Sequence, residues 1–427
     1  MWWQENDAVR DLAPSEERFV RHGTYTGRSV VIEGTVDEAA LGAAFDALQR
    51  EYPVVTCRIG EDRRGRGHLL RPGRAVMGMQ TGHGDAETIR IPSGPADPGT
   101  QLAYLDVVFA DSGQTRLTLF VHHAVADAGH CVALLSRLWE HYTDYVETGT
   151  TTVVPQGHPK SLEWYSADHG ILRGAVSSFE DVIRPLPSTP VVPISNAAAP
   201  AALVRPHRTV LDRVATARIV DLARHHEVTV NGLVTAALLR TFAAEKANAA
   251  GVPVNVGCLY PVDMRARLDP PVPAAAGTNM AGLASFSADI APTADRIELA
   301  RRISAKLRHD LAEGIVQQSV LHFPDFYGPH PLHSLAGHVA ITNTGRVPAF
   351  RTPRGITLAD YEIVYLSAHP RPSTGPSAAV TFLVYTFDGH LTVGILGAAA
   401  ARLLGSVEAE LASLSTESLE VEGRRSA

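Results

Sequence analysis

The sequence predicts a mixed α/β protein built from two lobes, each with a mixed sheet, and a cleft between them. The chain has 427 residues, 45% hydrophobic and 19% charged, which is enough to fill two cores. Segments of strand character alternate with long amphipathic helices in both halves. Six prolines fall within the Ala-rich stretch 185–206, where they interrupt regular structure. We therefore expect a first lobe over 1–184, a linker over 185–206 and a second lobe over 207–427.

Composition disfavours several classes of protein. The net charge is -7, with 38 basic and 45 acidic residues, and nucleic-acid binders usually carry the opposite balance. Three cysteines are too few for a disulfide framework or a cysteine-type zinc site, and an odd count suits a reducing compartment. The N-terminus does not resemble a signal peptide, and no apolar run is long enough to cross a membrane. We expect a cytoplasmic protein without a transmembrane segment.

Each half has its own order of predicted elements. In the first half we expect strand 29–32, helix 37–51, a hairpin of 54–59 and 68–70, strands 102–110 and 115–123, and helix 131–146. In the second half we expect strand 208–211, helices 216–224 and 231–246, strand 254–260, helix 293–312, strand 339–343, hairpin strands 379–387 and 391–396, and helix 400–414. Asp388-Gly389 is a favourable two-residue hairpin turn. The polar tail after Ser415 is expected to fray.

The stretch 120–130 carries most of the chemical information. A strand of alternating pattern ends at His122 and His123, which point to opposite faces. A strand end can aim a side chain into a cleft, and imidazole can act as a general base near neutral pH. Asp127, past the bend, could orient that imidazole or fix the bend through a salt bridge. The alternatives are a pair of partly buried polar groups or, less favoured because no third ligand is suitably spaced, a metal site.

This stretch also resembles the active-site motif of the CoA-dependent acyltransferase superfamily. The shared pattern is His-His, Asp four residues after the second histidine, and then a Gly-containing turn. Further stretches, at 260–265, 270–273, 278–279 and 314–323, resemble the polyketide-associated acyltransferases, the group that contains the phthiocerol/phthiodiolone dimycocerosyl transferases. The similarity extends over nearly the whole chain. It implies two lobes like those of chloramphenicol acetyltransferase, with a cleft or tunnel between them.

The resemblance implies a role for each motif residue. His123 would deprotonate an acceptor hydroxyl, which then attacks the thioester of an acyl-CoA or acyl-carrier protein directly. Asp127 would organise the loop through a salt bridge, with Arg265 as partner and Arg267 as the second choice. His122 and Gly129 would complete the structural frame of the site. No metal or organic cofactor is implied beyond the thioester co-substrate.

One position departs from the family pattern. The family usually has glycine directly after the aspartate, whereas this chain has Ala128 and then Gly129. Glycine adopts positive φ easily and permits close approach of a ligand. If the bend needs positive φ at position 128, the loop must rearrange, and Gly129 is the residue that would allow it.

Two further groups of residues are candidates for substrate contact. Asn343, Gln318, Ser319 and the backbone N–H groups near Gly129 could stabilise the oxyanion, with ordinary hydrogen bonding as the alternative. Arg301, Arg302 and Arg308 lie on helix 293–312. They could form a solvated face or a docking patch for an acidic carrier protein, and the resemblance places Arg308 at a carrier-protein contact. The pairs His225-His226 and His330/His333 are expected to be surface histidines.

The function that fits these observations is O-acyl transfer. The donor would be an acyl-CoA or an acyl carrier protein supplied in trans, and the acceptor a hydroxyl of a lipid or polyketide-type molecule. The first alternative is an amide-forming condensation enzyme, which would use the same base with an amine acceptor. The second is an inactive binding protein of the same fold, which Ala128 suggests but intact His123 and Asp127 disfavour.

Overall fold

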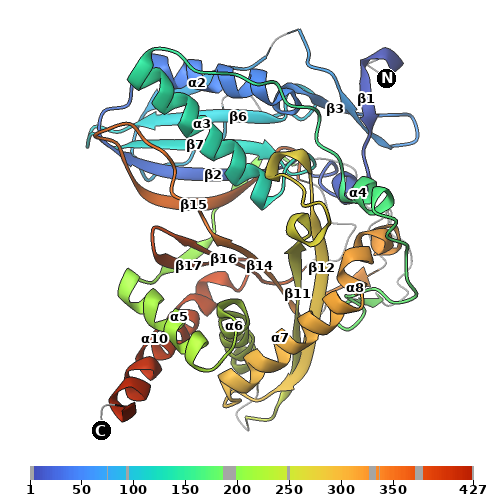
Figure 1. Cartoon of the computed structure of the whole chain (residues 1–427), viewed down its shortest axis with the longest axis vertical. Helices are drawn as coiled ribbons and strands as arrows, with labels where there is room; N and C mark the ends of the chain where they lie inside the picture. The colour runs from blue at the N-terminus through green and yellow to red at the C-terminus, as the bar shows by residue number, and fades with distance from the viewer. Residues whose placement is uncertain are drawn as a thin grey trace.

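The computed structural model confirms a mixed α/β fold with two principal sheets, one in each lobe (Figure 1). It describes residues 4–74, 76–92, 96–185, 199–247, 251–326, 333–335, 337–370 and 378–425. Two hydrophobic cores lie between these sheets and their helices, and a smaller cluster covers the other face of the first sheet. The cores are large because strands and helices in both lobes bury near-continuous apolar faces.

The first sheet contains six strands. In sheet order they are β5 (Met79–His83), β6 (Ala103–Phe109), β7 (Thr115–His122), β2 (Thr24–Glu33), β15 (Thr357–Ser367) and β9 (Ala202–Val204). All neighbours are antiparallel except β5 and β6. Helices α2 (Glu38–Glu51) and α3 (Ala128–Thr148) cover one face of this sheet (Figure 1).

Local signals fix where these two helices begin and end. The Asp37 carboxylate accepts a hydrogen bond from the Ala40 N–H at 3.0 Å and so caps α2. The Asp127 carboxylate caps α3 in the same way, through the N–H of His130. Gly149, with φ of 77°, ends α3 in the left-handed conformation that favours glycine. The start of α3 is thereby fixed directly after the strand that ends at the paired histidines.

The second sheet also contains six strands. In sheet order they are β10 (His207–Val210), β17 (His390–Leu396), β16 (Thr381–Phe387), β14 (Val339–Arg346), β11 (Val254–Asp263) and β12 (Ala281–Ile290). Its helices are α5 (Arg213–His225), α6 (Val230–Lys246), α7 (Arg296–Ala312) and α10 (Ala400–Arg425). The predicted hairpin turn is confirmed, because Asp388 and Gly389 both have positive φ. The predicted fraying after Ser415 is wrong: α10 continues through a stretch without proline.

Short elements complete the described chain. A three-stranded sheet joins β1 (Ala8–Asp11), β4 (Gly67–Leu70) and β3 (Arg58–Glu61), and β8 (Arg184–Pro185) pairs with β13 (His333–Ser334). The short helices are α1 (Pro14–Glu17), α4 (Leu162–Asp168), α8 (Ile315–Gln318) and α9 (Phe323–Phe326). Residues 54–56, expected as the start of a strand, lie instead in a 3-10 turn, Pro53–Thr56, that begins at a proline. In the part of the chain that the structure describes, no helix combines the length and apolarity needed to cross a bilayer.

The boundary between the lobes differs from the expected one. Strand β15 comes from the second half of the chain, yet it pairs along its length with β2, in the middle of the first sheet. Strand β9, within the expected linker, then adds to β15 at the edge of that sheet. Residues 186–198 of the expected linker lie outside the described residues. A division at residue 207 therefore does not separate the two sheets.

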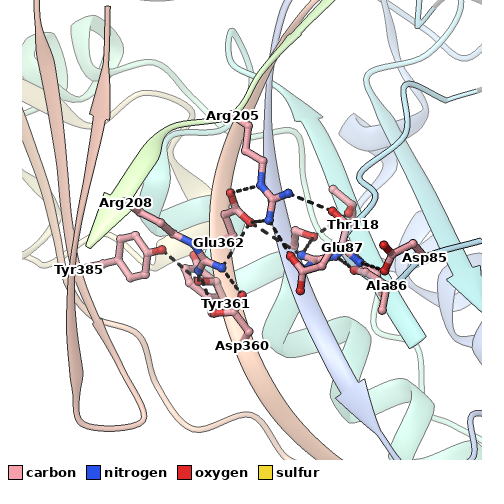
Figure 2. Close-up of polar contacts among 12 residues, drawn as sticks. Asp85, Ala86, Glu87, Thr118, Arg205, Arg208, Asp360, Tyr361, Glu362 and Tyr385 are labelled. Atoms are coloured by element: carbon pink, nitrogen blue, oxygen red, sulfur yellow. Dashed lines mark hydrogen bonds and ion pairs between the residues drawn. The ribbon is translucent and has the colours of Figure 1, made fainter. Parts of the chain in front are cut away.

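A cluster of buried charges holds this strand exchange together (Figure 2). Glu362 on β15 is fully buried and accepts hydrogen bonds from Arg205 at 2.7 and 2.8 Å. Arg208 on β10 of the second sheet donates to Asp360 on β15, at 2.8 Å for the longer bond. Arg116 on β7 lies 3.8 Å from Glu362. Because the buried Glu362 and the partly exposed Asp360 both have arginine partners, the exchanged strand is tied to both sheets without an unpaired negative charge at these two residues.

Candidate active site

The site is built where β7 ends and α3 begins. His122 is the last residue of β7, and the N–H of His123 still donates to the carbonyl of Thr24 on β2, at 2.7 Å. The N–H of Val125 then turns back onto the carbonyl of His122, at 3.0 Å. Asp127 follows in an extended conformation as the cap of α3. This strand–turn–helix unit sets His123 at a rigid corner of the first lobe.

The imidazole of His123 lies between two aromatic rings. Phe19 stacks on it, with ring centres 3.9 Å apart and planes 4° from parallel. The centre of the Tyr365 ring is 6.5 Å from the centre of the imidazole. The side chain is partly exposed, while its Nδ1 is buried and has no hydrogen-bond partner among the described residues. Because Nδ1 is buried, Nε2 is the ring nitrogen left to accept a proton of the substrate.

Electrostatics keep this imidazole neutral. The pKa of His123 is lowered to about 4, mainly by burial and then by the positive charge of Arg18, with a smaller effect from Arg28. The carboxylate of Asp127 opposes this shift. At neutral pH the ring is a proton acceptor, as a general base must be.

His122 faces the other side of the strand and is fully buried. Its Nδ1 accepts a hydrogen bond from the N–H of Ala124 at 3.2 Å, and its ring packs edge-on against Tyr25 at 5.0 Å. Burial, followed by the neighbouring His123, lowers the pKa of His122 to about 3. The first histidine of the pair therefore acts as a neutral packing residue of the turn.

The Asp127 carboxylate is directed to Arg265. The two guanidinium nitrogens of Arg265 donate to it at 2.8 and 3.0 Å, and the N–H groups of His130 and Met280 add bonds at 3.0 and 2.9 Å. Burial alone would raise the pKa of Asp127, but Arg265 and these N–H groups outweigh it and the pKa is lowered. Within the described structure none of these bonds reaches the imidazole. The salt-bridge alternative for Asp127 therefore fits the structure, and Arg265 rather than Arg267 is the partner.

Arg265 also makes hydrogen bonds within the second lobe. Its Nε donates to the carbonyl of Ala274 at 3.1 Å, and one terminal nitrogen donates to the carbonyl of Gly277 at 3.0 Å. It also pairs with Asp263 at 3.2 Å. All three guanidinium nitrogens are used, so the loop after β7 and the segment after β11 are held as one unit.

Asn279 is a site residue to which the sequence analysis gave no role. Its Nδ2 donates to the carbonyls of His123 and Ala124, at 2.7 and 3.1 Å. The adjacent Thr278 donates to the buried carboxylate of Glu16 at 2.6 Å. The resemblance of Thr278-Asn279 to the family sequences could have indicated that Asn279 belongs to the site. Phe19 and Tyr365 had no such signal, because only the tertiary fold brings them to His123.

The bend does not need positive φ at position 128, so the loop does not have to rearrange around Ala128. Ala128 is the first residue of α3, and neither it nor Gly129 has positive φ. A Cβ at Gly129 would lie 3.3 Å from a guanidinium nitrogen of Arg265. The small residue is needed for close approach of the arginine, whereas position 128 needs only ordinary helical geometry, which alanine adopts readily.

The three candidate oxyanion side chains have partners elsewhere. Gln318 accepts from the N–H of Gly174 at 3.0 Å and donates to the carbonyl of Val176 at 2.6 Å. Ser319 accepts from Leu283 N–H and donates to the carbonyl of Val316, at 2.8 and 2.7 Å. Asn343 donates to Asn231 at 2.7 Å. The structure does not bring these side chains to His123, so their role in oxyanion stabilisation gains no support from it.

The basic residues of α7 form a separate surface. Arg301, Arg302 and Arg308 are exposed and line a pocket of about 440 Å³ together with His226, Glu227, Glu298 and Ala305. Arg301 lies 3.8 Å from Glu298. His225 is exposed at the end of α5, as expected; His333 is half-buried in β13, and His330 lies outside the described residues. Across the described residues, no group of three or more potential ligands is placed to hold a metal ion.

Comparison with known sequences identifies the family. The model of the phthiocerol/phthiodiolone dimycocerosyl transferase C-terminus matches residues 200–396. The phthiocerol/phthiodiolone dimycocerosyl transferase of Mycobacterium bovis (BCG Pasteur) is 34% identical over 398 residues, covering 90% of this chain and 92% of the relative. The chain belongs to this family. The Mycobacterium leprae member is 33% identical over 373 residues, covering 83% of this chain and 85% of the relative.

Solved structures agree with this assignment. Polyketide synthase associated protein 5 from Mycobacterium tuberculosis superposes with a TM-score of 0.79 at 28% identity, covering 96% of this chain and 99% of that one. The first condensation domain of the CDA synthetase gives a TM-score of 0.62 at 16% identity, covering 96% and 97%, and supports the fold alone. As a member of the dimycocerosyl transferase family, the chain is an acyltransferase with a condensation-domain-like fold.

Proposed function

We propose that this acyltransferase transfers an acyl group from a pantetheine thioester to the hydroxyl of a lipid or polyketide-type acceptor, with His123 as the general base. The observation that carries the proposal is the state of His123. Its imidazole is neutral, its Nδ1 is buried, and it is held by Phe19 and by the Asn279 bonds to the main chain. A neutral imidazole whose Nε2 is left for the substrate is suited to accept a hydroxyl proton.

The proposed reaction is a direct transfer. Nε2 of His123 takes the acceptor proton while the acceptor oxygen forms a bond to the thioester carbonyl carbon. The C–S bond then breaks, and the imidazolium returns the proton to the leaving thiolate. Asp127 does not enter these steps, because its carboxylate is committed to Arg265 and to two backbone N–H groups.

The proposed donor is an acyl-CoA or an acyl carrier protein in trans. The pocket lined by Arg301, Arg302 and Arg308 supports a carrier protein, because such proteins are acidic and this surface is exposed and basic. The hydroxyl acceptor is supported by the named relatives, which are dimycocerosyl transferases of phthiocerol and phthiodiolone. The amide-forming alternative is supported by likeness of fold only.

The proposal is tested with a panel of donors and acceptors. The purified chain is incubated with acyl-CoAs, or with acyl-loaded carrier protein, together with a long-chain alcohol or the matched long-chain amine. Mass spectrometry measures ester, amide, free thiol and the intact protein mass. Ester with an unmodified protein supports the proposal. Amide without ester, a covalent acyl-protein adduct, or no product from either donor would contradict it.

A further inference from the structure

Arg28 is a buried cation close to the site with no acidic partner. It lies on β2 with 2% of its surface exposed. One terminal nitrogen donates to the hydroxyl of Thr26 at 2.5 Å and to the carbonyl of Gly27 at 3.3 Å. Its Nε is buried, and across the described residues neither a hydrogen bond to that atom nor an ion pair to the side chain is present.

The other large buried arginines are neutralised. Arg116 lies 3.8 Å from Glu362 and 3.6 Å from Glu87, and Arg265 pairs with Asp127 and Asp263. Arginine does not lose its proton under physiological conditions, so Arg28 carries a full positive charge into the core. Burying a charge without a counter-ion costs folding free energy. Because Arg28, unlike Arg116 and Arg265, has no ion pair among the described residues, its charge is a candidate for a functional role at the proposed base.

The register of the sheet places Arg28 on the same face as His123. Arg28 pairs with Leu119 and Thr26 pairs with Val121 across β2 and β7, while the carbonyl of Thr24 accepts from His123. Leu119, Val121 and His123 alternate along the strand and so share one face, and cross-strand partners lie on that same face. The bond from Arg28 to Thr26 turns the guanidinium along the strand toward His123.

The charged and titratable groups around His123 come from several elements. Arg18, after α1, lies 4.5 Å from the centre of the Phe19 ring that stacks on the imidazole. Asp127 at the start of α3 is neutralised by Arg265. Tyr365 on β15 and His122 on β7 are uncharged at neutral pH. Asp127 acts against the positive charges of Arg18 and Arg28 at the base, and of these two arginines Arg28 is the one buried in the core.

We propose that Arg28 is a positioning residue of the acyl-transfer site, whose unneutralised charge adds to burial and to the charge of Arg18 in keeping His123 in the neutral, proton-accepting form. The charge acts through His123 and requires no contact with substrate. It also makes the imidazolium a stronger acid, so the proton taken from the acceptor hydroxyl passes readily to the departing thiolate. The catalytic part of this inference rests on the proposed function, whereas the electrostatic part does not.

The test measures the titration of His123 without substrate. Hydrogen–deuterium exchange at the imidazole C2 position, followed by mass spectrometry with fragmentation, reports the pKa of each histidine separately. Arg28→Met is compared with Arg28→Lys, which keeps the charge, and with Arg116→Met, which removes a buried arginine from the opposite face of the sheet.

We expect Arg28→Met to raise the titration midpoint of His123 by up to about one pH unit, because a positive charge that lowers the pKa of this imidazole is lost. Arg28→Lys and Arg116→Met should leave that midpoint within a few tenths of a unit. A folded Arg28→Met protein with an unchanged His123 midpoint overturns the inference. It would leave the proposed function intact, because that function is judged separately by transfer activity of the His123 variant.

A second pair of variants covers the case in which Arg28→Met does not fold. Thr26→Asp supplies a carboxylate where Arg28 already donates a hydrogen bond, and Thr26→Asn is the uncharged match. If Arg28 is an unneutralised cation, Thr26→Asp should melt several degrees higher than Thr26→Asn and raise the His123 midpoint. A Thr26→Asp protein that melts lower than Thr26→Asn would contradict the inference, because a carboxylate buried without a cation is destabilising.

Discussion

The guanidinium of Arg265 donates two hydrogen bonds to the carboxylate of Asp127, at 2.8 and 3.0 Å. The two residues come from different lobes, and Asp127 is four residues from His123. The same guanidinium binds the carbonyl of Gly277, two residues before Asn279, which holds the carbonyl of His123. The position of the proposed base therefore depends on the docking of the second lobe against the first.

Asp127→Asn should destabilise the protein by about 3 kcal/mol, because it leaves the buried guanidinium of Arg265 without its counter-charge. Urea unfolding at pH 7.5 measures this loss. The double variant Asp127→Asn/Arg265→Met should recover part of it, since it removes both charges. An Asp127→Asn protein as stable as the parent chain would show that the pair contributes little to stability.

Asn279→Ala should reduce the rate of transfer at saturating substrate more than tenfold and leave KM nearly unchanged. The substitution removes the donors to the carbonyls of His123 and Ala124 and frees the loop that carries the imidazole. The stability cost should be about 1–3 kcal/mol. Steady-state kinetics measure both parameters, with Asn255→Ala as a control, because Asn255 is exposed and bonds to Asp289. Equal kinetics for the two variants would remove Asn279 from the account of the site.

Arg308→Glu should weaken transfer from an acyl carrier protein at least tenfold and leave transfer from acyl-CoA unchanged. The expected reason is loss of charge complementarity with an acidic partner, so the effect should shrink as ionic strength rises. Arg63→Glu makes the same charge change at an exposed position of the first lobe and should have no such effect. If both variants behave alike, the basic pocket on α7 is not the docking surface.

Stability should fall between pH 7.5 and pH 5.5. Burial lowers the pKa of His122 to about 3 and of His123 and His130 to about 4, below the ordinary value of about 6.5 in the unfolded chain. Below the pKa of the unfolded chain, the unfolded state binds protons at these histidines and the folded state does not. The free energy of unfolding therefore decreases as the pH falls. Each histidine should cost about 1.4 kcal/mol at pH 5.5.

The pKa of Asp127 is also lowered, but this carboxylate changes the stability of the fold in a more acidic pH range. It stabilises the fold above the unfolded value of about 3.9 and is lost only as the pH falls below that. Urea unfolding at the two pH values should therefore show a loss of stability, and His130→Gln should reduce that loss by about 1.4 kcal/mol. A free energy of unfolding that is equal at pH 7.5 and 5.5 would contradict the assigned burial of these rings.

Local pattern was sufficient for much of the fold. The alternation that ends at His123, the cap at Asp127 and the turn at Asp388-Gly389 each depend on a few adjacent residues, so they can be read from sequence. Strand β15 could not be predicted in this way, because Asp360 and Glu362 make its sequence resemble a polar loop. Those charges are tolerated in the sheet only because arginines distant in sequence neutralise them. Strand β12 is rich in Ala, Gly and Ser, which have low strand propensity.

The same reasoning separates the site residues. The motif gave His123 and Asp127, and the family resemblance gave Arg265. Phe19 and Tyr365 lie beside His123 because of the tertiary fold and the pairing of β2 with β7 and β15. These contacts depend on strand pairing over hundreds of residues, which no local signal specifies. Gln318 and Ser319 were chosen by polar residue type, which does not show that their side chains already make other hydrogen bonds.

The most direct test of the account is the rate of ester formation by His123→Ala, measured beside the parent chain and His225→Ala with the donor and alcohol that give turnover. Circular dichroism and thermal melting establish that all three proteins are folded. The account predicts a loss of at least a hundredfold for His123→Ala, the lower range of a general-base contribution, and an unchanged rate for the exposed His225→Ala. A folded His123→Ala protein that forms ester at nearly the parental rate would contradict the role of His123 as the base.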